Sequence, residues 1–230
     1  MYSGIAELLN IEECLKNYNH YLAKRIFNRI KGLNNVLEFG AGIGTLAKNL
    51  SNLYKIKPEC IELDPRLAEV IHKNEFVCYR NLNQTTKVYD AIYSSNVLEH
   101  IEDDSRALKE IASRIKIGGY LILYLPAKKI LYSEIDRDLG HYRRYEAQEL
   151  NEKVRTAGFE ILEWEYNDAL GLLIWLFYKV KKYRNISPLK NNRALNIYDK
   201  YLFPVSSALD RLGFKKIIGK NIFLVAQRIS

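Results

Sequence analysis

The strongest constraint on the fold is a turn with three glycines that joins a strand-like run to a helix-like run. The stretch VLEFGAGIGTLAKNL spans residues 36–50 and places Gly40, Gly42 and Gly44 in the turn. The apolar run before the glycines is typical of a buried strand, and helical spacing follows them. In open parallel sheets, ligands bind at the carboxyl ends of the strands. The turn therefore predicts a ligand site at such an edge.

Strands and helices alternate along the rest of the chain. Six further strand-like segments cover residues 59–63, 76–79, 89–95, 120–126, 159–166 and 221–229. Helical patterns cover residues 13–31, 45–53, 101–116 (ended by Gly118-Gly119) and 146–157, and Asp64 before Pro65 predicts a capped helix start. This alternation predicts an α/β fold with a Rossmann-like seven-stranded sheet and helices on both faces.

We expect one domain over residues 1–230. It comprises an N-terminal helical segment (1–34), a core (35–166 and 221–230) and a helical insertion or lid (167–220). The insertion contains the run GLLIWLFYKVKKYR, a helix begun by Ser187-Pro188 and a helix around VSSALDRL. We expect Trp164 and Trp175 to be core or interface residues.

Charge and cysteine content limit the function classes. The three cysteines are far apart and form no Cys-x-x-Cys pair, which argues against disulfides and a zinc site and favours a reducing, cytoplasmic location. The N-terminus lacks the basic region of a signal peptide. Residues 171–230 hold 12 of the 35 basic side chains but only two of the 27 acidic ones, a net +10 against −2 elsewhere. This basic region is either a solvated surface or a face for an anionic partner.

The residues around the turn indicate which ligand it holds. Thr45 stands where a dinucleotide-binding fingerprint needs its third glycine, and no Gly-Lys-Ser/Thr of a P-loop follows. Glu38 lies two residues before the first glycine, where a carboxylate suits a cationic ligand. Glu62 ends the next strand, at the position of a carboxylate that binds ribose hydroxyls. A ribonucleoside with a cationic, phosphate-free remainder fits, and S-adenosylmethionine (SAM) is such a molecule.

The stretches VLEFGAGIG, CIELDPRLAE, YDAIYSSNVLEHIEDD and LKEIASRIKIGGYLILYLP resemble the successive motifs of class I SAM-dependent methyltransferases, in order and spacing. The resemblance implies a sheet whose last strand is antiparallel and lies between the fifth and sixth. LYSEIDRDLGHYRRY, YDKYLFPVSSALDRL and GKNIFLVAQR resemble a bacterial subgroup with this GHYRRY-type loop, for which the resemblance implies no particular acceptor.

The resemblance also implies roles for single residues in binding SAM. Glu38, Gly40, Ala41, Gly42 and Gly44 would face its methionine part, Glu62 would bind the ribose hydroxyls and Leu63 would flank the adenine. Ser94, Ser95 and Asn96 would line the pocket after the fourth strand. An Asp that the family often carries after the third strand is replaced here by the sequence YRNLNQ, so Asn81 or Asn83 would take its place.

The acceptor side should follow the fifth strand, at residues 127–145. His141 is our candidate general base, because a histidine can exchange protons near neutral pH. Asp136 is the second catalytic candidate. The alternative is that His141 only fixes the loop. We expect the acceptor to contact five further side chains, namely Tyr132, Tyr142, Arg143, Arg144 and Tyr145. The arginines would clamp a phosphate or carboxylate, or else pair with acidic residues of the loop.

No metal is expected. Some relatives bind a divalent ion through Glu-x-x-Glu-His, but Asn96 occupies the first position here, before Glu99 and His100. One carboxylate ligand is missing, so Glu99 and His100 are expected to start a helix. Tyr18 and His20 either cover the SAM pocket or pack as a helix face.

The predicted activity is methyl transfer from SAM to an acceptor, as oxygen methylation of a small-molecule, glycan or lipid-linked substrate. The alternatives are an RNA-directed methyltransferase that uses the basic C-terminal region, and a non-catalytic SAM-binding protein. No nucleic-acid partner is expected, because SSNV replaces the motif of amino-methylating nucleic-acid enzymes. Residues 171–184 suit two roles, of which one is peripheral contact with the inner membrane face. The alternative is that this run packs on the sheet or on a second copy in a homodimer.

Overall fold

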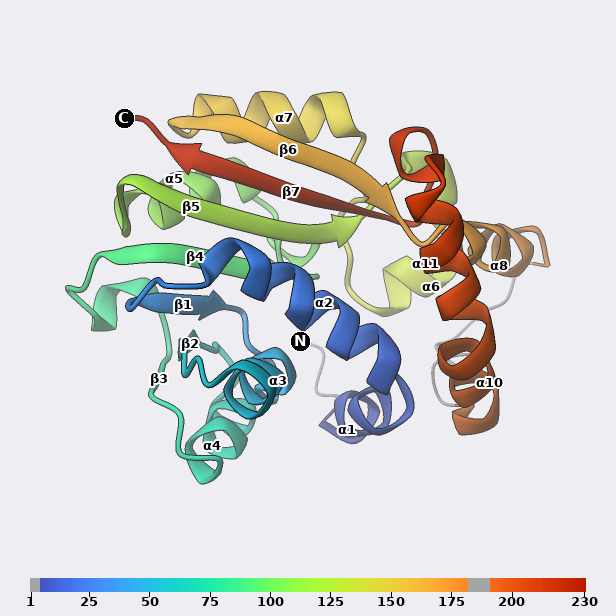
Figure 1. The fold of residues 1–230 in the computed structure, drawn as a ribbon, viewed down its shortest axis with the longest axis horizontal. Coiled ribbons are helices and arrows are strands. Elements are labelled where there is room, and N and C mark those ends of the chain that lie inside the picture. Colours follow the sequence, from blue (N-terminus) through green and yellow to red (C-terminus); the bar gives the residue numbers. More distant parts are fainter. Residues whose placement is uncertain (1–4, 182–190) are drawn as a thin grey trace.

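The computed structural model describes residues 5–181 and 191–230 and contains a seven-stranded sheet between helices (Figure 1). The strand order is β3-β2-β1-β4-β5-β7-β6, and only β7 runs antiparallel to its neighbours, β5 and β6. The predicted fold class is confirmed, including the place of the last strand. The strands are β1 (Val36–Phe39), β2 (Glu59–Ile61), β3 (Cys78–Tyr79), β4 (Tyr89–Ser95), β5 (Ile115–Pro126), β6 (Phe159–Asn167) and β7 (Asn221–Arg228).

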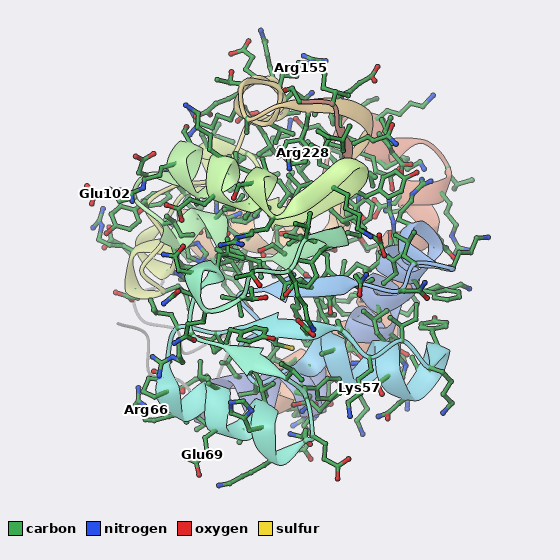
Figure 2. All side chains as sticks on the ribbon, turned by 90° about the vertical axis from the view of Figure 1, so that its left-hand side faces the viewer. Lys57, Arg66, Glu69, Glu102, Arg155 and Arg228 are labelled. Atoms are coloured by element: carbon green, nitrogen blue, oxygen red, sulfur yellow. The ribbon has the colours of Figure 1, made fainter. Side chains whose placement is uncertain are left out.

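Helices cover both faces of the sheet, and charged side chains such as Arg66, Glu69 and Arg155 lie around the outside (Figure 2). Those that position the site are α1 (Ile5–Cys14), α2 (Lys16–Ile30), α3 (Thr45–Tyr54), α4 (Pro65–Lys73), α5 (Asp104–Ser113), α6 (Glu134–Asp138), α7 (Ala147–Thr156), α8 (Ala169–Val180), α10 (Asn192–Ile197) and α11 (Phe203–Arg211). No helix within the described ranges is long and apolar enough to cross a membrane.

The alternation of side chains along the central strands accounts for these layers. In β4, Ala91 and Tyr93 pack with α2 and α3, whereas Ile92 between them packs with α5 and α7. Successive strand residues point to opposite faces, so a strand that is apolar throughout must be covered on both sides. The core is therefore split into two halves by the sheet.

Two predicted helices differ from the observed ones. The pattern at residues 13–31 is divided at Leu15, because the carboxylate of Asp199 accepts hydrogen bonds from the backbone N–H groups of Asn17 and Tyr18 and so caps a new helix, α2. The helix predicted at 101–116 ends at Ser113, and Gly118-Gly119 lie inside β5. The cap at Asp64 is confirmed, since its Oδ1 accepts from the N–H of Arg66 at 2.8 Å.

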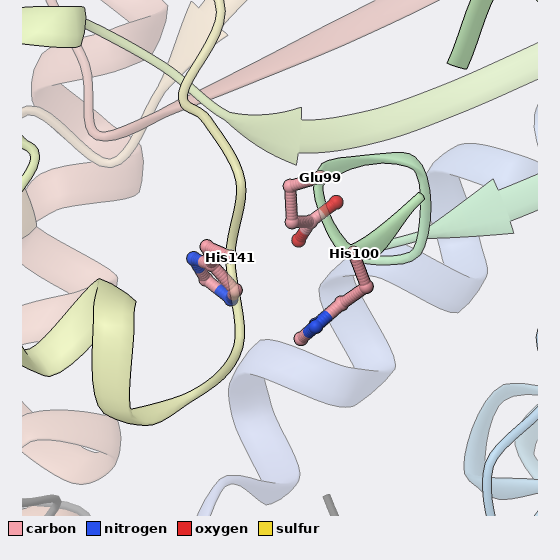
Figure 3. Close-up of side chains that lie close together, drawn as sticks. All are labelled: Glu99, His100 and His141. Atoms are coloured by element: carbon pink, nitrogen blue, oxygen red, sulfur yellow. The ribbon is translucent and has the colours of Figure 1, made fainter. Parts of the chain in front are cut away.

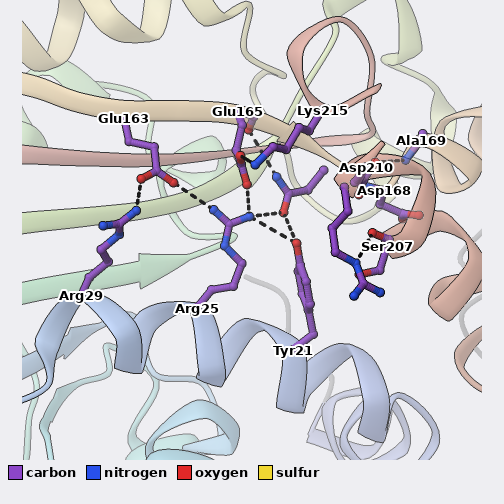
Figure 4. Close-up of polar contacts among 12 residues, drawn as sticks. Tyr21, Arg25, Arg29, Glu163, Glu165, Asp168, Ala169, Ser207, Asp210 and Lys215 are labelled. Atoms are coloured by element: carbon purple, nitrogen blue, oxygen red, sulfur yellow. Dashed lines mark hydrogen bonds and ion pairs between the residues drawn. The ribbon is translucent and has the colours of Figure 1, made fainter. Parts of the chain in front are cut away.

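The segment between β6 and β7 lies with α1 and α2 at the carboxyl ends of the parallel strands (Figure 1). Charged side chains fix this arrangement: Arg25 of α2 pairs with Glu163 and Glu165 of β6, and Glu165 also pairs with Lys215 after α11 (Figure 4). The helix predicted around VSSALDRL is α11, whereas the helix start predicted at Ser187-Pro188 lies outside the described residues.

Candidate functional site

The glycine turn after β1 adopts backbone angles that favour glycine. Gly40, Gly42 and Gly44 have φ angles of +77°, +58° and +78°. A Cβ atom at Gly40 would lie 2.4 Å from the nearer methyl carbon of Val97, so the turn passes too close to this side chain for any other residue. The N–H groups of Gly40 and Ala41 both donate to the carbonyl of Ile61 at 2.9 Å, which ties the turn to β2. The result is a rigid backbone loop that ends at the N-terminus of α3.

Two carboxylates flank the glycine turn. The Oε2 atom of Glu62 accepts from the N–H of Gly42 at 2.7 Å, and its Oε1 accepts from the N–H of Asp64 at 2.9 Å. The Oε2 atom of Glu38 accepts from the Tyr93 hydroxyl at 2.9 Å and from the N–H of Ala47 at 3.1 Å. Burial raises the pKa of Glu38 to about 8 and also raises the pKa of Glu62. A cationic ligand beside Glu38 would favour its charged form.

A cavity of about 1050 Å³ opens at these carboxylates. Small-molecule sites have volumes of about 300–1,000 Å³, so this cavity is at the upper end of that range. Among the predicted cofactor residues, nine line the cavity: Glu38, Gly40, Ala41, Gly42, Glu62, Leu63, Asn81, Ser95 and Asn96. Gly44 and Ser94 lie behind its wall, where Ser94 is buried and donates from its hydroxyl to the carbonyl of Phe39 at 2.8 Å. Of the two asparagines proposed after the third strand, only Asn81 lines the cavity.

The other end of the cavity contains His141, held by Asp136. The Nδ1 atom of His141 lies 3.0 Å from Oδ1 of Asp136, which leaves Nε2 free to meet a ligand. Asp136 is fully buried, does not line the cavity and also accepts from Nε of Arg144 at 2.8 Å. Burial alone would raise the pKa of Asp136, but His141 and Arg144 outweigh it and lower the pKa. Asp136 therefore holds His141 and Arg144 from outside the cavity, and its catalytic role stays a prediction.

The acceptor loop is only partly built as predicted. Tyr142 and Arg144 line the cavity, whereas Tyr132, Arg143 and Tyr145 do not. The Tyr145 hydroxyl donates to Asp104 at 2.8 Å, and Arg143 pairs with the same carboxylate at 2.9 Å. These two residues hold the loop onto α5 and do not line the cavity, so their contact with the acceptor stays a prediction that this geometry does not favour. Tyr132 also has a structural contact, because its hydroxyl donates to the carbonyl of His141 at 2.7 Å.

The insertion brings further residues to the cavity that the sequence patterns do not predict. Trp175 of α8, Tyr198 after α10 and Lys220 before β7 all line it, and so does Tyr18 of α2, whereas His20 is exposed on the outside of that helix. Trp175 was expected in the core or an interface, but its indole nitrogen lies 3.4 Å from Asp136. A helical insertion at this end of the sheet was the only signal, and it did not identify single residues.

Glu99 and His100 lie opposite His141, in a single 3₁₀ turn (Leu98–His100) after β4. Glu99 is fully buried, and neither carboxylate oxygen has a hydrogen-bond partner among the described residues. Burial raises its pKa to about 8. Burial and the nearby His141 lower the pKa of His100 to about 4. The expected helix-start role explains the backbone of these residues but not the unpartnered carboxylate.

Comparison with known proteins identifies the family. Residues 11–163 match a family model described as a methyltransferase domain. The chain belongs to this family. No curated protein matches the chain closely enough to be reported.

Solved structures show how widely the fold is shared. A SAM-dependent methyltransferase from Archaeoglobus fulgidus is 17% identical, with a TM-score of 0.61 over 91% of this chain and 92% of the other. Phosphoethanolamine N-methyltransferase 2 from Haemonchus contortus, solved in complex with SAM, is 18% identical, with a TM-score of 0.59 over 93% and 53%. The [4+2]-cyclase SpnF is 18% identical, with a TM-score of 0.59 over 91% of this chain and 80% of the other. At such identities the likeness concerns the fold alone.

The protein is thus a methyltransferase by family, and SAM is the cofactor that its sequence motifs imply. SAM supplies, when bound, a methyl group on a cationic sulfur that a nucleophile can displace. The residues present fit it: a glycine-rich turn, Glu62 for the ribose diol and the buried Glu38 for the cationic part. The donor end of the cavity thus suits the cofactor, and the His141 end remains for an acceptor.

Proposed function

We propose that this methyltransferase methylates an oxygen atom of a small-molecule, glycan or lipid-linked acceptor. The observation that supports this most is that His141, held by the buried Asp136, lines the same cavity as the glycine turn. A nucleophile between them would have the donor on one side and a proton acceptor on the other. The resemblance of the acceptor loop to the bacterial GHYRRY-type subgroup belongs to the same proposal.

In this proposal His141 removes the proton of the acceptor hydroxyl. The oxygen forms a bond to the methyl carbon, the methyl–sulfur bond breaks, and sulfur leaves with the electron pair of that bond as a neutral thioether. The proton passes to Nε2 of His141, and the Asp136 carboxylate beside Nδ1 stabilises the imidazolium. Leu139, Tyr142 and Trp175 line this end of the cavity and reduce the access of water to the reacting atoms.

The charges at the acceptor end favour an acceptor without a strong net charge. Arg144 is buried in an ion pair with Asp136 at 2.8 Å, and Lys220 pairs with Asp168 at 3.2 Å. Both cations are already neutralised, so a phosphate clamp by adjacent arginines is not part of the proposal. Trp175 and Tyr198 provide aromatic surface beside them, which suits a sugar ring or another partly apolar group.

We further propose that α8 touches an anionic membrane, where a lipid-linked acceptor would be presented. Leu173, Phe177 and Val180 are 56%, 52% and 70% exposed, so the outer face of this helix does not pack on the sheet. Lys179 of α8 donates to the carbonyl of Ile130. Ile130 is 72% exposed, so a further apolar residue lies beside the exposed face of α8. Apolar side chains next to lysines suit the headgroup region. Residues 182–184 of the predicted contact lie outside the described residues.

Flotation with anionic liposomes tests this contact. The wild-type protein should float at low salt, and the Phe177→Ser/Val180→Ser variant should not. Ile117→Ser is the matched control, because Ile117 is 65% exposed near the amino-terminal end of β5, away from the cavity. Wild-type protein that stays at the bottom would rule out the membrane contact. A dimer that the double variant disrupts would instead support a second copy as the occupant of this face.

A methylation screen with labelled SAM tests the acceptor class. The purified protein is incubated with lipid, glycan, small-molecule and RNA fractions of a lysate. Label in the lipid, glycan or small-molecule fraction that mass spectrometry assigns to a methoxy group supports oxygen methylation as proposed. Label in RNA alone would support the RNA-directed alternative, and SAM binding without transfer to any fraction would support the non-catalytic one.

A further inference from the structure

Three side chains converge at the acceptor end of the cavity, and only one of them, His141, has a role in the proposed reaction. Glu99 and His100 come from the turn after β4, and His141 faces them from the acceptor loop (Figure 3). One ligand atom from each, a carboxylate oxygen or a ring nitrogen, lies within 4.8 Å of the others. The two imidazole rings are 4.6 Å apart between centroids and nearly perpendicular, at 86°.

Glu99 provides the second, independent observation. It is fully buried, and both of its carboxylate oxygens lack a hydrogen-bond partner in the part of the chain that the structure describes. Leaving a buried carboxyl group without a partner costs folding free energy, so such a group calls for a ligand or another explanation. Figure 3 shows the Glu99 side chain close to the two histidine rings. A cation bound between these three side chains would provide the partner that the carboxylate lacks.

The rings of His100 and His141 are already held in fixed orientations, as metal binding requires. His141 places Nδ1 against the buried Asp136 at 3.0 Å, so Nε2 is the nitrogen that remains for a ligand. A carboxylate behind the outer nitrogen is the usual support of a metal-binding histidine, because it fixes the tautomer and the ring orientation. The ring of His100 lies edge-on to that of His141, with 4.6 Å between the ring centroids.

We propose that Glu99, His100 and His141 bind one divalent transition-metal ion. Two imidazoles and one carboxylate favour ions such as Co²⁺, Mn²⁺, Fe²⁺ or Zn²⁺ over Mg²⁺ and Ca²⁺, which prefer oxygen ligands. Three protein ligands leave coordination positions open, and both histidines line the cavity. An acceptor oxygen could take one of these positions. The inference departs from the expectation drawn from the sequence, where Asn96 in place of a carboxylate and a helix-start role for Glu99 and His100 argued against a metal.

The site has a consequence for His141. An Nε2 atom that binds a metal ion is not available to remove a proton, so the base step proposed above applies to the protein without a bound ion. Variants of Glu99 and His100 distinguish the base role from the ligand role, because the base mechanism assigns no function to these two residues. Loss of metal affinity on replacing Glu99 therefore supports the metal site without any assumption about catalysis.

Cobalt titration of the full chain tests the proposal without SAM or acceptor, so its outcome does not depend on the proposed function. We measure Co²⁺ binding by calorimetry and by the visible absorption of the bound ion. The wild-type protein should bind one Co²⁺ per chain. Glu99→Gln, His100→Ala and His141→Ala should each bind at least ~10-fold more weakly, since even loss of a group that only supports a ligand weakens binding by about 10–100-fold.

The chain provides a matched control in its other two histidines. His20 and His72 lie on exposed helix positions, so the His20→Ala/His72→Ala variant should bind Co²⁺ like the wild type. Thermal unfolding separates lost ligands from lost folding: Co²⁺ should raise the melting temperature of the wild type and of the control, but not that of a folded Glu99→Gln variant. Unchanged affinity in folded Glu99→Gln, or affinity lost only in the control, would overturn the proposal.

Discussion

The two ends of the cavity are built in different ways. At the donor end, backbone groups of one strand–turn–helix unit and of the next strand end hold Glu38 and Glu62, and the Tyr93 hydroxyl of the neighbouring strand also donates to Glu38. At the acceptor end, side chains from distant segments hold one another, as Trp175 and Arg144 do around Asp136. A ligand site held by local backbone needs little from the rest of the chain, whereas a site held by side chains depends on every segment that contributes.

The largest expected effect is at the acceptor end. If His141 is the base, His141→Ala should lower turnover by about 10²–10⁴-fold, the usual contribution of proton transfer by a positioned side chain. SAM affinity should be preserved, because the donor end does not depend on this ring. His72→Ala is the control, since this ring lies at the exposed end of α4. Turnover is measured with labelled SAM and the acceptor fraction from the screen. Wild-type turnover in His141→Ala would remove this residue from the mechanism.

The next effect is at the donor end. Gly40→Ala places a Cβ atom 2.4 Å from a methyl carbon of Val97 and forces a left-handed conformation on alanine. The turn must shift, and SAM affinity should fall by roughly 10²-fold, corresponding to about 2–3 kcal/mol. Gly32→Ala is the matched control: its φ is also positive, +84°, but nothing lies within 4 Å of the added atom. It should lose stability and keep SAM affinity. Equal affinities of the two variants in calorimetry would contradict the close fit of the turn.

A smaller effect follows from the buried carboxylate at the donor end. Glu38 keeps its proton up to about pH 8 in the folded protein, whereas the unfolded chain loses it above about pH 4.5. The unfolded state thus binds fewer protons in this window, and Glu38 makes the free energy of unfolding fall as pH rises from 5 to 8. Glu38→Gln keeps an oxygen for Tyr93 and Ala47 and lacks this titration. By pH 8 we expect the variant to be more stable than wild type by about 1–3 kcal/mol.

Urea unfolding at pH 5 and pH 8 measures this difference, which should nearly vanish at pH 5. Other buried acids also titrate in this window, so only the difference between the two proteins is informative. Parallel stability curves for wild type and Glu38→Gln would show that Glu38 is charged throughout.

The same contrast explains what the sequence could predict. The donor end was predicted in detail, because the positive φ angles of Gly40 and Gly42 and the strand-end position of Glu62 are local properties of a short stretch. The strand order followed from the alternation of strands and helices together with the family resemblance. The helix predicted over residues 101–116 was too long, because Gly118-Gly119 look like a helix stop. In the structure α5 ends at Ser113, and both glycines lie inside β5.

The acceptor end could not be predicted in the same way. Arg143 and Arg144 are adjacent in the chain, yet one pairs with Asp104 outside the cavity and the other with Asp136 beside it. Trp175 lies in an apolar run that looks uniform, and only the packed position of α8 turns this one side chain inward while Phe177 stays exposed. Such choices depend on contacts between distant segments, which a single sequence does not contain.

Titration calorimetry of SAM into two variants tests most directly whether the ends of the cavity are separate. Glu62→Ala removes the carboxylate at the glycine turn and should weaken SAM binding by roughly 1–3 kcal/mol, the scale of a lost charge-assisted hydrogen bond. Trp175→Ala removes an aromatic wall of the acceptor end and should leave SAM affinity within about 0.5 kcal/mol of wild type. Unchanged affinity in Glu62→Ala, or an equal loss in Trp175→Ala, would contradict the division of the cavity into a donor and an acceptor end.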